Sequence, residues 1–90
     1  MGVKAEISWK RRDEEGNRRE VYARHVGTQW VFFERERRFD CWEPLEHPSL
    51  EDWMELLDGV ERRAQRRLVR PEEVHRVKKT IHELFPEAEV

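Results

Sequence analysis

The chain has 90 residues, which is the size of one small domain. Charged residues make up 42% of the sequence, but acids and bases nearly cancel and leave a formal net charge of -2. A protein that binds polyanions through its overall charge normally carries a large basic excess, so the composition argues against a general nucleic-acid binder. Four Trp and four Phe supply apolar surface for a compact core.

The cysteine content and the hydropathy pattern bear on the cellular compartment. Cys41 is the single cysteine, so no internal disulfide forms, and a free thiol is typical of a reducing environment. The sequence shows no apolar leader and no run of about 18 apolar residues. We therefore expect a cytoplasmic protein with no membrane partner.

Alternating apolar and polar residues predict two strands in the first third of the chain, because successive strand side chains point to opposite faces. The first strand covers residues 3–10. A polar turn at residues 13–17 leads to the second strand, residues 18–26, in which Tyr22 points away from the more regular apolar face. Short connections of this kind favour antiparallel hairpins.

The third predicted strand, residues 28–35, differs from the first two because both of its faces are apolar. Trp30 and Phe32 point one way, whereas Val31 and Phe33 point the other way. Such a strand is typical of the centre of a sheet that is covered on both sides.

The segment after the third strand carries weaker signals. Residues 39–42 are a candidate fourth strand, and the sequence leaves that question open. Two prolines favour extended backbone and mark residues 44–48 as a linker. The predicted sheet region is therefore residues 1–43.

Two amphipathic helices are predicted in the second half of the chain. Ser49 is a favoured N-cap, and Asp52 stands where a capping box places an acid, so the first helix covers residues 49–69. Proline at the first position favours a second helix at residues 71–85. A second proline ends that helix, and the last five residues are expected to fray.

These elements predict one domain, residues 1–90, of the α+β class. It consists of an antiparallel meander of three or four strands, followed by two amphipathic helices packed on one face of the sheet. Helices on one face leave aromatic side chains exposed on the other face, and exposed apolar patches usually mark interaction sites. The alternative is that the first helix or the linker covers that second face.

Tyr22, Trp30 and Phe32 are the predicted interface residues, because aromatic side chains are typical interface anchors. We therefore expect a small non-catalytic protein–protein interaction or adaptor module. Symmetric homodimers are the commonest oligomers, so the first expectation is self-association through this face, and another protein is the next.

A second candidate surface is the basic end of the first helix. Its members are Arg62, Arg63, Arg66, Arg67 and Arg70. Bases near a helix C-terminus complement the helix dipole, which is the structural explanation for their position. Like charges four residues apart are nevertheless destabilising, and such a patch can bind phosphates. The alternative function is therefore a nucleic-acid-binding accessory protein.

No pattern in the sequence predicts catalysis, a cofactor or a metal site. His75 and His82 stand two helical turns, or about 10 Å, apart, which is too far for one zinc ion. Cys41 lies between Asp40 and Glu43, whose negative charge disfavours a nucleophilic thiolate. The scattered glycines form no phosphate-binding loop. We expect no enzyme activity, no cofactor and no metal.

Overall fold

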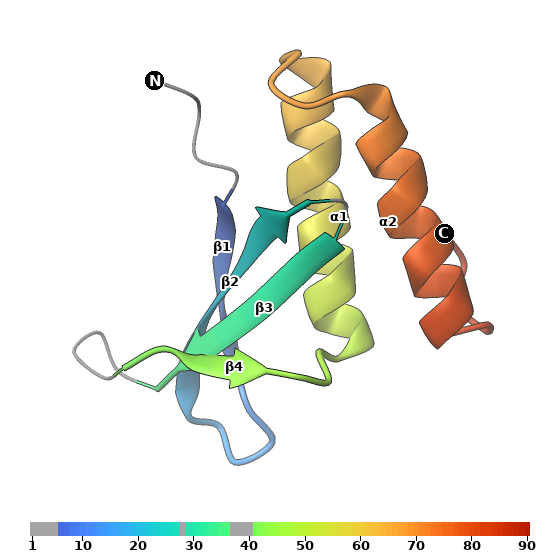
Figure 1. Ribbon diagram of the computed structural model, residues 1–90. Helices are drawn as coiled ribbons and strands as arrows, with labels where there is room; N and C mark the ends of the chain where they lie inside the picture. The colour runs from blue at the N-terminus through green and yellow to red at the C-terminus, as the bar shows by residue number, and fades with distance from the viewer. Residues whose placement is uncertain (1–5, 28, 37–40) are drawn as a thin grey trace. The chain divides into compact units, whose positions relative to one another are not determined.

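The computed structural model describes residues 6–27, 29–36 and 41–90 (Figure 1). Within them the strands are β1 (Glu6–Arg12), β2 (Arg18–Val26), β3 (Gln29–Arg35) and β4 (Glu43–Leu45). The helices are α1 (Leu50–Gln65) and α2 (Pro71–Leu84). The predicted α+β order, an antiparallel meander followed by two helices, is confirmed.

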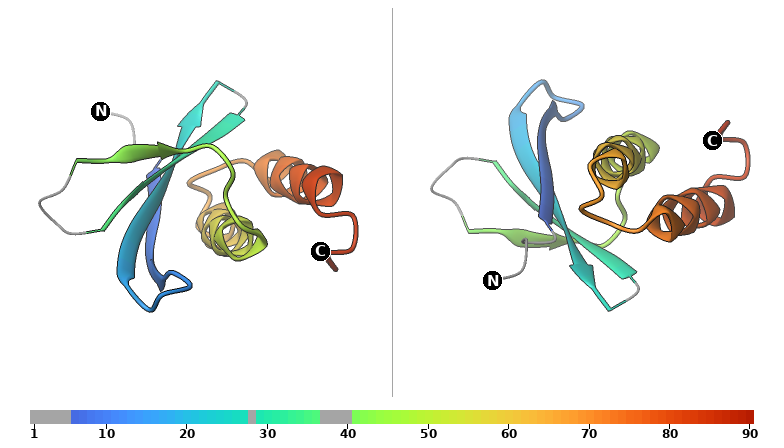
Figure 2. Two further views of the ribbon diagram at one scale, coloured as in Figure 1. Left: turned by 90° about the horizontal axis from the view of Figure 1, so that it is seen from below. Right: turned by 90° about the horizontal axis from the view of Figure 1, so that it is seen from above.

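The chain divides into two compact units, a sheet unit (Met1–Pro48) and a helical unit (Ser49–Val90). In the sheet unit the strands follow the order β1-β2-β3-β4, and each described pair of neighbours is antiparallel (Figure 2). The expectation that the helices pack on one sheet face concerns the placement of the two units, and it stays a prediction.

One face of the sheet holds the core of the sheet unit. We call it the Phe32 face, and its apolar members include Ile7, Trp9, Val21, Ala23, Trp30, Phe32 and Leu45. Ile7, Ala23 and Phe32 are consecutive cross-strand partners, so their side chains form one row. All three are buried, and the Trp9 ring meets Phe32 edge-on with centroids 5.9 Å apart. The register therefore fixes which aromatic residues enter the core.

Strand β4 lies later in the chain than expected. The sequence offered residues 39–42 as a candidate strand and marked residues 44–48 as a linker, whereas the strand is Glu43–Leu45. Cys41 and Trp42 belong to no strand, and the first half of the candidate lies outside the described residues. Pro44 and Leu45 of the predicted linker belong to β4, because β4 is an edge strand and an edge strand tolerates a proline without breaking the sheet.

The helical unit begins with the predicted capping box. The Ser49 hydroxyl accepts a hydrogen bond from the Asp52 backbone N–H at 3.2 Å, and the Asp52 carboxylate accepts one from the Ser49 N–H at 3.3 Å. The two helices run antiparallel within the unit (Figure 1). Their buried apolar residues are Trp53, Leu56, Leu57, Val60, Val77 and Ile81.

Helix α1 ends at Gln65, four residues before the predicted end at residue 69. Arg67 adopts a left-handed backbone with a φ of 61°. The Arg67 N–H donates to the Ala64 carbonyl at 3.0 Å, and the Leu68 N–H donates to the Arg63 carbonyl at 2.8 Å. These two bonds form a Schellman motif, which terminates a helix whatever the apolar spacing beyond it.

Candidate functional site

The face of the sheet opposite the core carries an aromatic cluster. We call it the Tyr22 face, and its strand residues include Ser8, Lys10, Glu20, Tyr22, Arg24, Val31, Phe33, Arg35 and Pro44. Tyr22 and Phe33 are direct cross-strand partners, and their rings stack at 18° with centroids 4.9 Å apart. Trp42, which precedes β4, meets the Tyr22 ring at 88° and 4.6 Å. All three rings are half-buried, so the cluster is only partly covered.

Arg35 fixes the position of this cluster. Its guanidinium carbon lies 4.2 Å from the centre of the Trp42 ring, which is the geometry of a cation–π interaction. The same guanidinium contacts one Glu20 carboxylate oxygen through Nη2 at 2.7 Å and through Nε at 2.9 Å. Ring stacking, a cation–π interaction and an ion pair therefore all stabilise the aromatic cluster.

The three predicted interface residues do not share one surface. Tyr22 lies on the Tyr22 face, whereas Trp30 and Phe32 lie on the Phe32 face. Phe32 is only 3% exposed, so its assignment as a surface anchor is corrected: it is a core residue beside Ala23. Trp30 is half-buried and stacks on His25 at 20° with centroids 4.7 Å apart.

Sequence reasoning missed Phe33, Arg35 and Trp42 as members of the site. Alternation placed Phe33 opposite Phe32 in the third strand, but only the register shows that Phe33 shares a face with Tyr22. If Val21 is assigned to the core face, Tyr22 falls on the opposite face, and the cross-strand register then places Phe33 beside it. Trp42 lies outside any strand, so no periodicity indicates where its ring goes.

Charged side chains on the Phe32 face and at its turn are paired with each other. Arg11 bonds Glu34 at 3.2 Å. Arg19 contacts both Glu34 and Asp13 at 3.2 Å, and it reaches Glu36 at 3.4 Å. Both arginines at this end of the sheet therefore have acid partners.

The Tyr22 face has a different charge balance. Its strands carry the bases Lys10, Arg12, Arg18, Arg24 and Arg35, and its acids in the described strands are Glu6 and Glu20. Glu20 forms an ion pair with Arg35. Lys10, Arg18 and Arg24 are exposed and form no ion pair within the described residues. The face therefore combines half-exposed aromatic rings with a local excess of positive charge.

The arginines predicted to bind phosphates lie in the helical unit, at the end of α1 and in the turn before α2. We call Arg62, Arg63, Arg66, Arg67 and Arg70 the arginine turn. Arg62 pairs with Asp58 at 3.0 Å, but both side chains are exposed and the pair contributes little. Arg66 is the C-cap of α1, and Arg70 is the N-cap of α2. Two of the five thus occupy capping positions, and phosphate binding stays a prediction.

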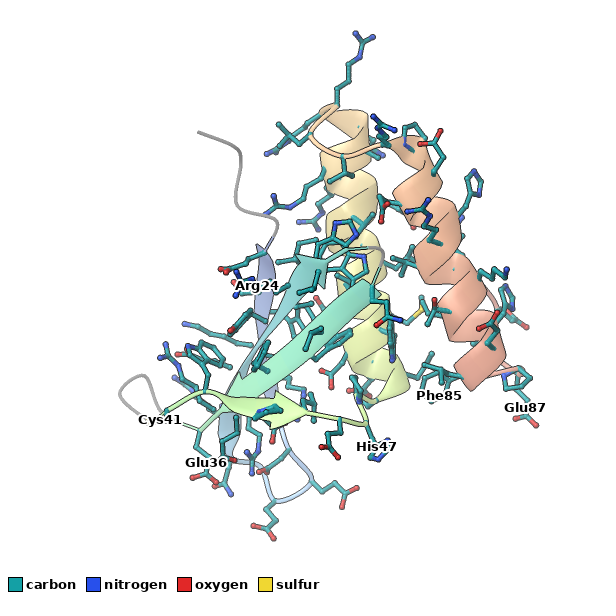
Figure 3. All side chains as sticks on the ribbon, viewed as in Figure 1. Arg24, Glu36, Cys41, His47, Phe85 and Glu87 are labelled. Atoms are coloured by element: carbon teal, nitrogen blue, oxygen red, sulfur yellow. The ribbon has the colours of Figure 1, made fainter. Side chains whose placement is uncertain are left out.

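Two shallow pockets lie one within each unit. The first, of about 410 Å³, is lined by Arg19, Arg35, Glu36, Cys41 and Glu43. Figure 3 shows Glu36 and Cys41 at the same end of the sheet. Both lining arginines already have acid partners, so the exposed Cys41 thiol meets no unpaired cation among them. The second pocket, of about 550 Å³, is lined by Leu50, Leu84, Phe85, Pro86, Glu87 and Ala88.

The described part of the chain holds neither a metal-binding cluster nor a helix fit to span a membrane. No group of His, Cys, Asp and Glu side chains there is arranged to hold a metal ion. None of the helices found there has both the length and the apolar character needed to cross a membrane. Comparison with protein-family models, with curated proteins and with solved structures finds no match for this chain.

Proposed function

We propose that this chain is a small non-catalytic protein–protein interaction module that binds its partner through the Tyr22 face. The observation that carries the proposal is the cluster of Tyr22, Phe33 and Trp42, whose rings come from three segments and remain half-exposed. Val31, on the same face, is 37% exposed. Aromatic side chains and arginine are enriched in the residues that dominate binding energy at protein interfaces.

The side chains of the cluster already contact one another before any partner arrives. The Tyr22 and Phe33 rings stack on each other. The Trp42 ring contacts Arg35 through a cation–π interaction and meets the Tyr22 ring edge-on. Binding costs conformational entropy for every side chain that must be ordered at the interface. Side chains that are already ordered reduce this cost, which supports a binding role for the cluster.

The charges on the Tyr22 face favour a partner that is a different protein over a second copy. A face-to-face dimer with two-fold symmetry would place Lys10, Arg18 and Arg24 opposite the same set on the other copy. Like charges brought together across an interface are unfavourable. We therefore expect the purified chain to sediment as a monomer at micromolar concentration.

Photo-crosslinking in the source cell tests the proposal. A photoreactive residue replaces Val31, which lies on the Tyr22 face opposite Arg24, and a matched chain carries it at Glu14, which is exposed in the β1–β2 turn. We expect a discrete protein adduct from position 31 only, and we expect excess unlabelled wild-type chain to suppress it. The same adducts from both positions, or none from position 31, would contradict the proposal.

A further inference from the structure

We infer that the partner presents an acidic polypeptide segment with interspersed apolar side chains to the Tyr22 face. This inference rests on the proposed function, since it names the chemistry of the partner for the same surface. Three observations carry it: the sign of the charge on the face, the orientation of the aromatic rings, and the exposed valines between the bases.

The first observation is that three exposed bases of this face, Lys10, Arg18 and Arg24, have no acid partner among the described residues. Arg12 and Arg18 are direct cross-strand partners, and like charges opposite each other destabilise a sheet. The neighbouring pair, Arg11 and Arg19, is also directly opposite, but the Glu34 carboxylate bonds both. No acid among the described residues bridges Arg12 and Arg18 in this way.

The positive sign is also a property of this face and not of the whole chain. The chain has a net charge of -2, yet the strands of the Tyr22 face carry five bases against two acids. Figure 3 shows Arg24 and Glu36 at opposite ends of the sheet. Bases that the fold leaves uncompensated on one face match a partner of negative charge.

The second observation separates an acidic polypeptide from a single-stranded nucleic acid. Proteins that bind single strands offer aromatic rings on whose open faces the bases stack. Here the Tyr22 and Phe33 rings are stacked on each other, and Arg35 lies over the Trp42 ring. One face of each of these rings is therefore occupied, which leaves fewer ring faces for bases to stack on, whereas the partly positive ring edges suit carboxylates.

The third observation concerns the apolar part of the partner. Val31 and Val26 are 37% and 54% exposed, and Arg24 is the cross-strand partner of Val31. Apolar and basic side chains therefore alternate across this part of the face. A segment in which carboxylates and apolar side chains alternate would satisfy both kinds of residue.

Fluorescence anisotropy with defined probes tests the inference. The probes are a labelled peptide of repeated Glu-Glu-Leu, its Lys-Lys-Leu counterpart and an oligo-dT strand, each titrated at about 50 and about 200 mM salt. We expect the wild-type chain to bind the Glu-Glu-Leu peptide, more weakly at the higher salt, and to bind neither of the other two. Preference for oligo-dT, or equal binding of both peptides, overturns the inference.

Two charge-matched variants locate the binding site. Lys10→Gln/Arg18→Gln/Arg24→Gln removes three exposed bases from the Tyr22 face, and Arg62→Gln/Arg66→Gln/Arg70→Gln removes three from the arginine turn. We expect the first variant to lose affinity for the Glu-Glu-Leu peptide by about tenfold or more, and the second to keep wild-type affinity. Equal losses would assign the binding to net charge and overturn the inference.

The crosslinking experiment separates this inference from the proposed function. If the adduct at position 31 persists at full yield in the Lys10→Gln/Arg18→Gln/Arg24→Gln variant, the partner binds the face without using its bases. The inference then fails while the proposed function stands. If neither an adduct nor peptide binding is found, both fail.

Discussion

The Arg35 guanidinium lies 4.2 Å from the centre of the Trp42 ring and 2.7 Å from a Glu20 carboxylate oxygen. One side chain thus joins a residue of β2 to the aromatic residue that precedes β4. Both partners of the ion pair are partly buried, with 20% and 27% of their side chains exposed. The pair is therefore less screened by solvent than an ordinary surface ion pair, and the position of Trp42 depends on it.

Substitution of Arg35 tests this dependence. Arg35→Met keeps the aliphatic packing but removes the positive charge and the two guanidinium N–H groups that bond Glu20. We therefore expect the free energy of unfolding, measured by urea titration, to fall by about 1–2 kcal/mol. Arg35→Lys keeps the charge and is expected to lose less. Arg24→Met, an exposed position on the same face, is the control and is expected to stay within about 0.5 kcal/mol of wild type. Equal stability of Arg35→Met and wild type would show that the contacts contribute nothing.

Asp13 closes the β1–β2 turn and makes the stability of the sheet unit depend on pH. Its Oδ1 accepts the backbone N–H groups of Asn17 and Glu15, both at 2.9 Å, and its Oδ2 accepts Arg19 Nε at 3.2 Å. The Asn17 amide, with smaller contributions from Arg19 and the Glu15 amide, holds the pKa of the Asp13 carboxyl below its ordinary value of 3.8. The folded state therefore favours the ionised carboxylate.

The sign of the pH dependence follows from that lowered pKa. Asp13 stabilises the fold fully above the ordinary carboxyl pKa of about 4, and this contribution is lost as the pH falls through the lower folded pKa. Asp13→Asn keeps the turn acceptor but not the charge. We expect the unfolding free energies of wild type and Asp13→Asn to differ at about pH 6 and to converge toward about pH 2. Parallel curves over this range would contradict the assignment.

Much of the fold could be predicted from the sequence because its periodicities are strong. The first three strands and the starts of both helices lie within a few residues of their expected places, since one buried face fixes the alternation and Ser49 marks a helix start. Strand β4 has only three residues, which is too short for a period-two pattern to stand out. The end of α1 carried no glycine signal, because Arg67 occupies the left-handed position.

The candidate site was harder to predict because it depends on register. Tyr22 and Phe33 are eleven positions apart, and only the turn between β2 and β3 decides that they face each other. The sequence showed that the third strand is apolar on both faces, but it did not show which face enters the core. For that reason the sequence predicts Trp30 and Phe32 as surface anchors, whereas the row formed with Ala23 buries Phe32.

The left-handed Arg67 predicts that α1 can be stabilised at its C-terminus. A residue with a Cβ costs about 1–2 kcal/mol in this conformation. Glycine avoids that cost, but its greater freedom in the unfolded chain makes folding less favourable by about 0.5–1 kcal/mol. We expect Arg67→Gly to raise the free energy of unfolding by about 0.5–1 kcal/mol, seen in urea titration as a higher midpoint with an unchanged slope. Arg67→Ala removes the same charge but keeps the Cβ, so it is the matched control and is expected to show no gain. Equal effects of the two variants would assign the change to the charge.

We expect replacement of Trp30 by phenylalanine not to destabilise the protein, in contrast to most substitutions of a tryptophan. The Trp30 Nε1–H is buried and has no acceptor within the described residues, and a buried donor without a partner costs about 1–3 kcal/mol. Trp30→Phe removes that donor and keeps an aromatic ring for His25 to stack on. We expect the variant to be as stable as wild type or more stable by about 1 kcal/mol in urea titration, because the gain offsets the lost packing volume.

Trp9 provides the comparison for Trp30, since its ring packs edge-on against the buried Phe32. Trp9→Phe removes packing volume without relieving an unpartnered donor, so we expect it to lose about 1 kcal/mol or more. The same loss in Trp30→Phe as in Trp9→Phe would show that the Trp30 N–H has an acceptor in solution. A difference of about 1 kcal/mol between the two variants, in favour of Trp30→Phe, would show that the indole N–H carries an uncompensated desolvation cost in the native state.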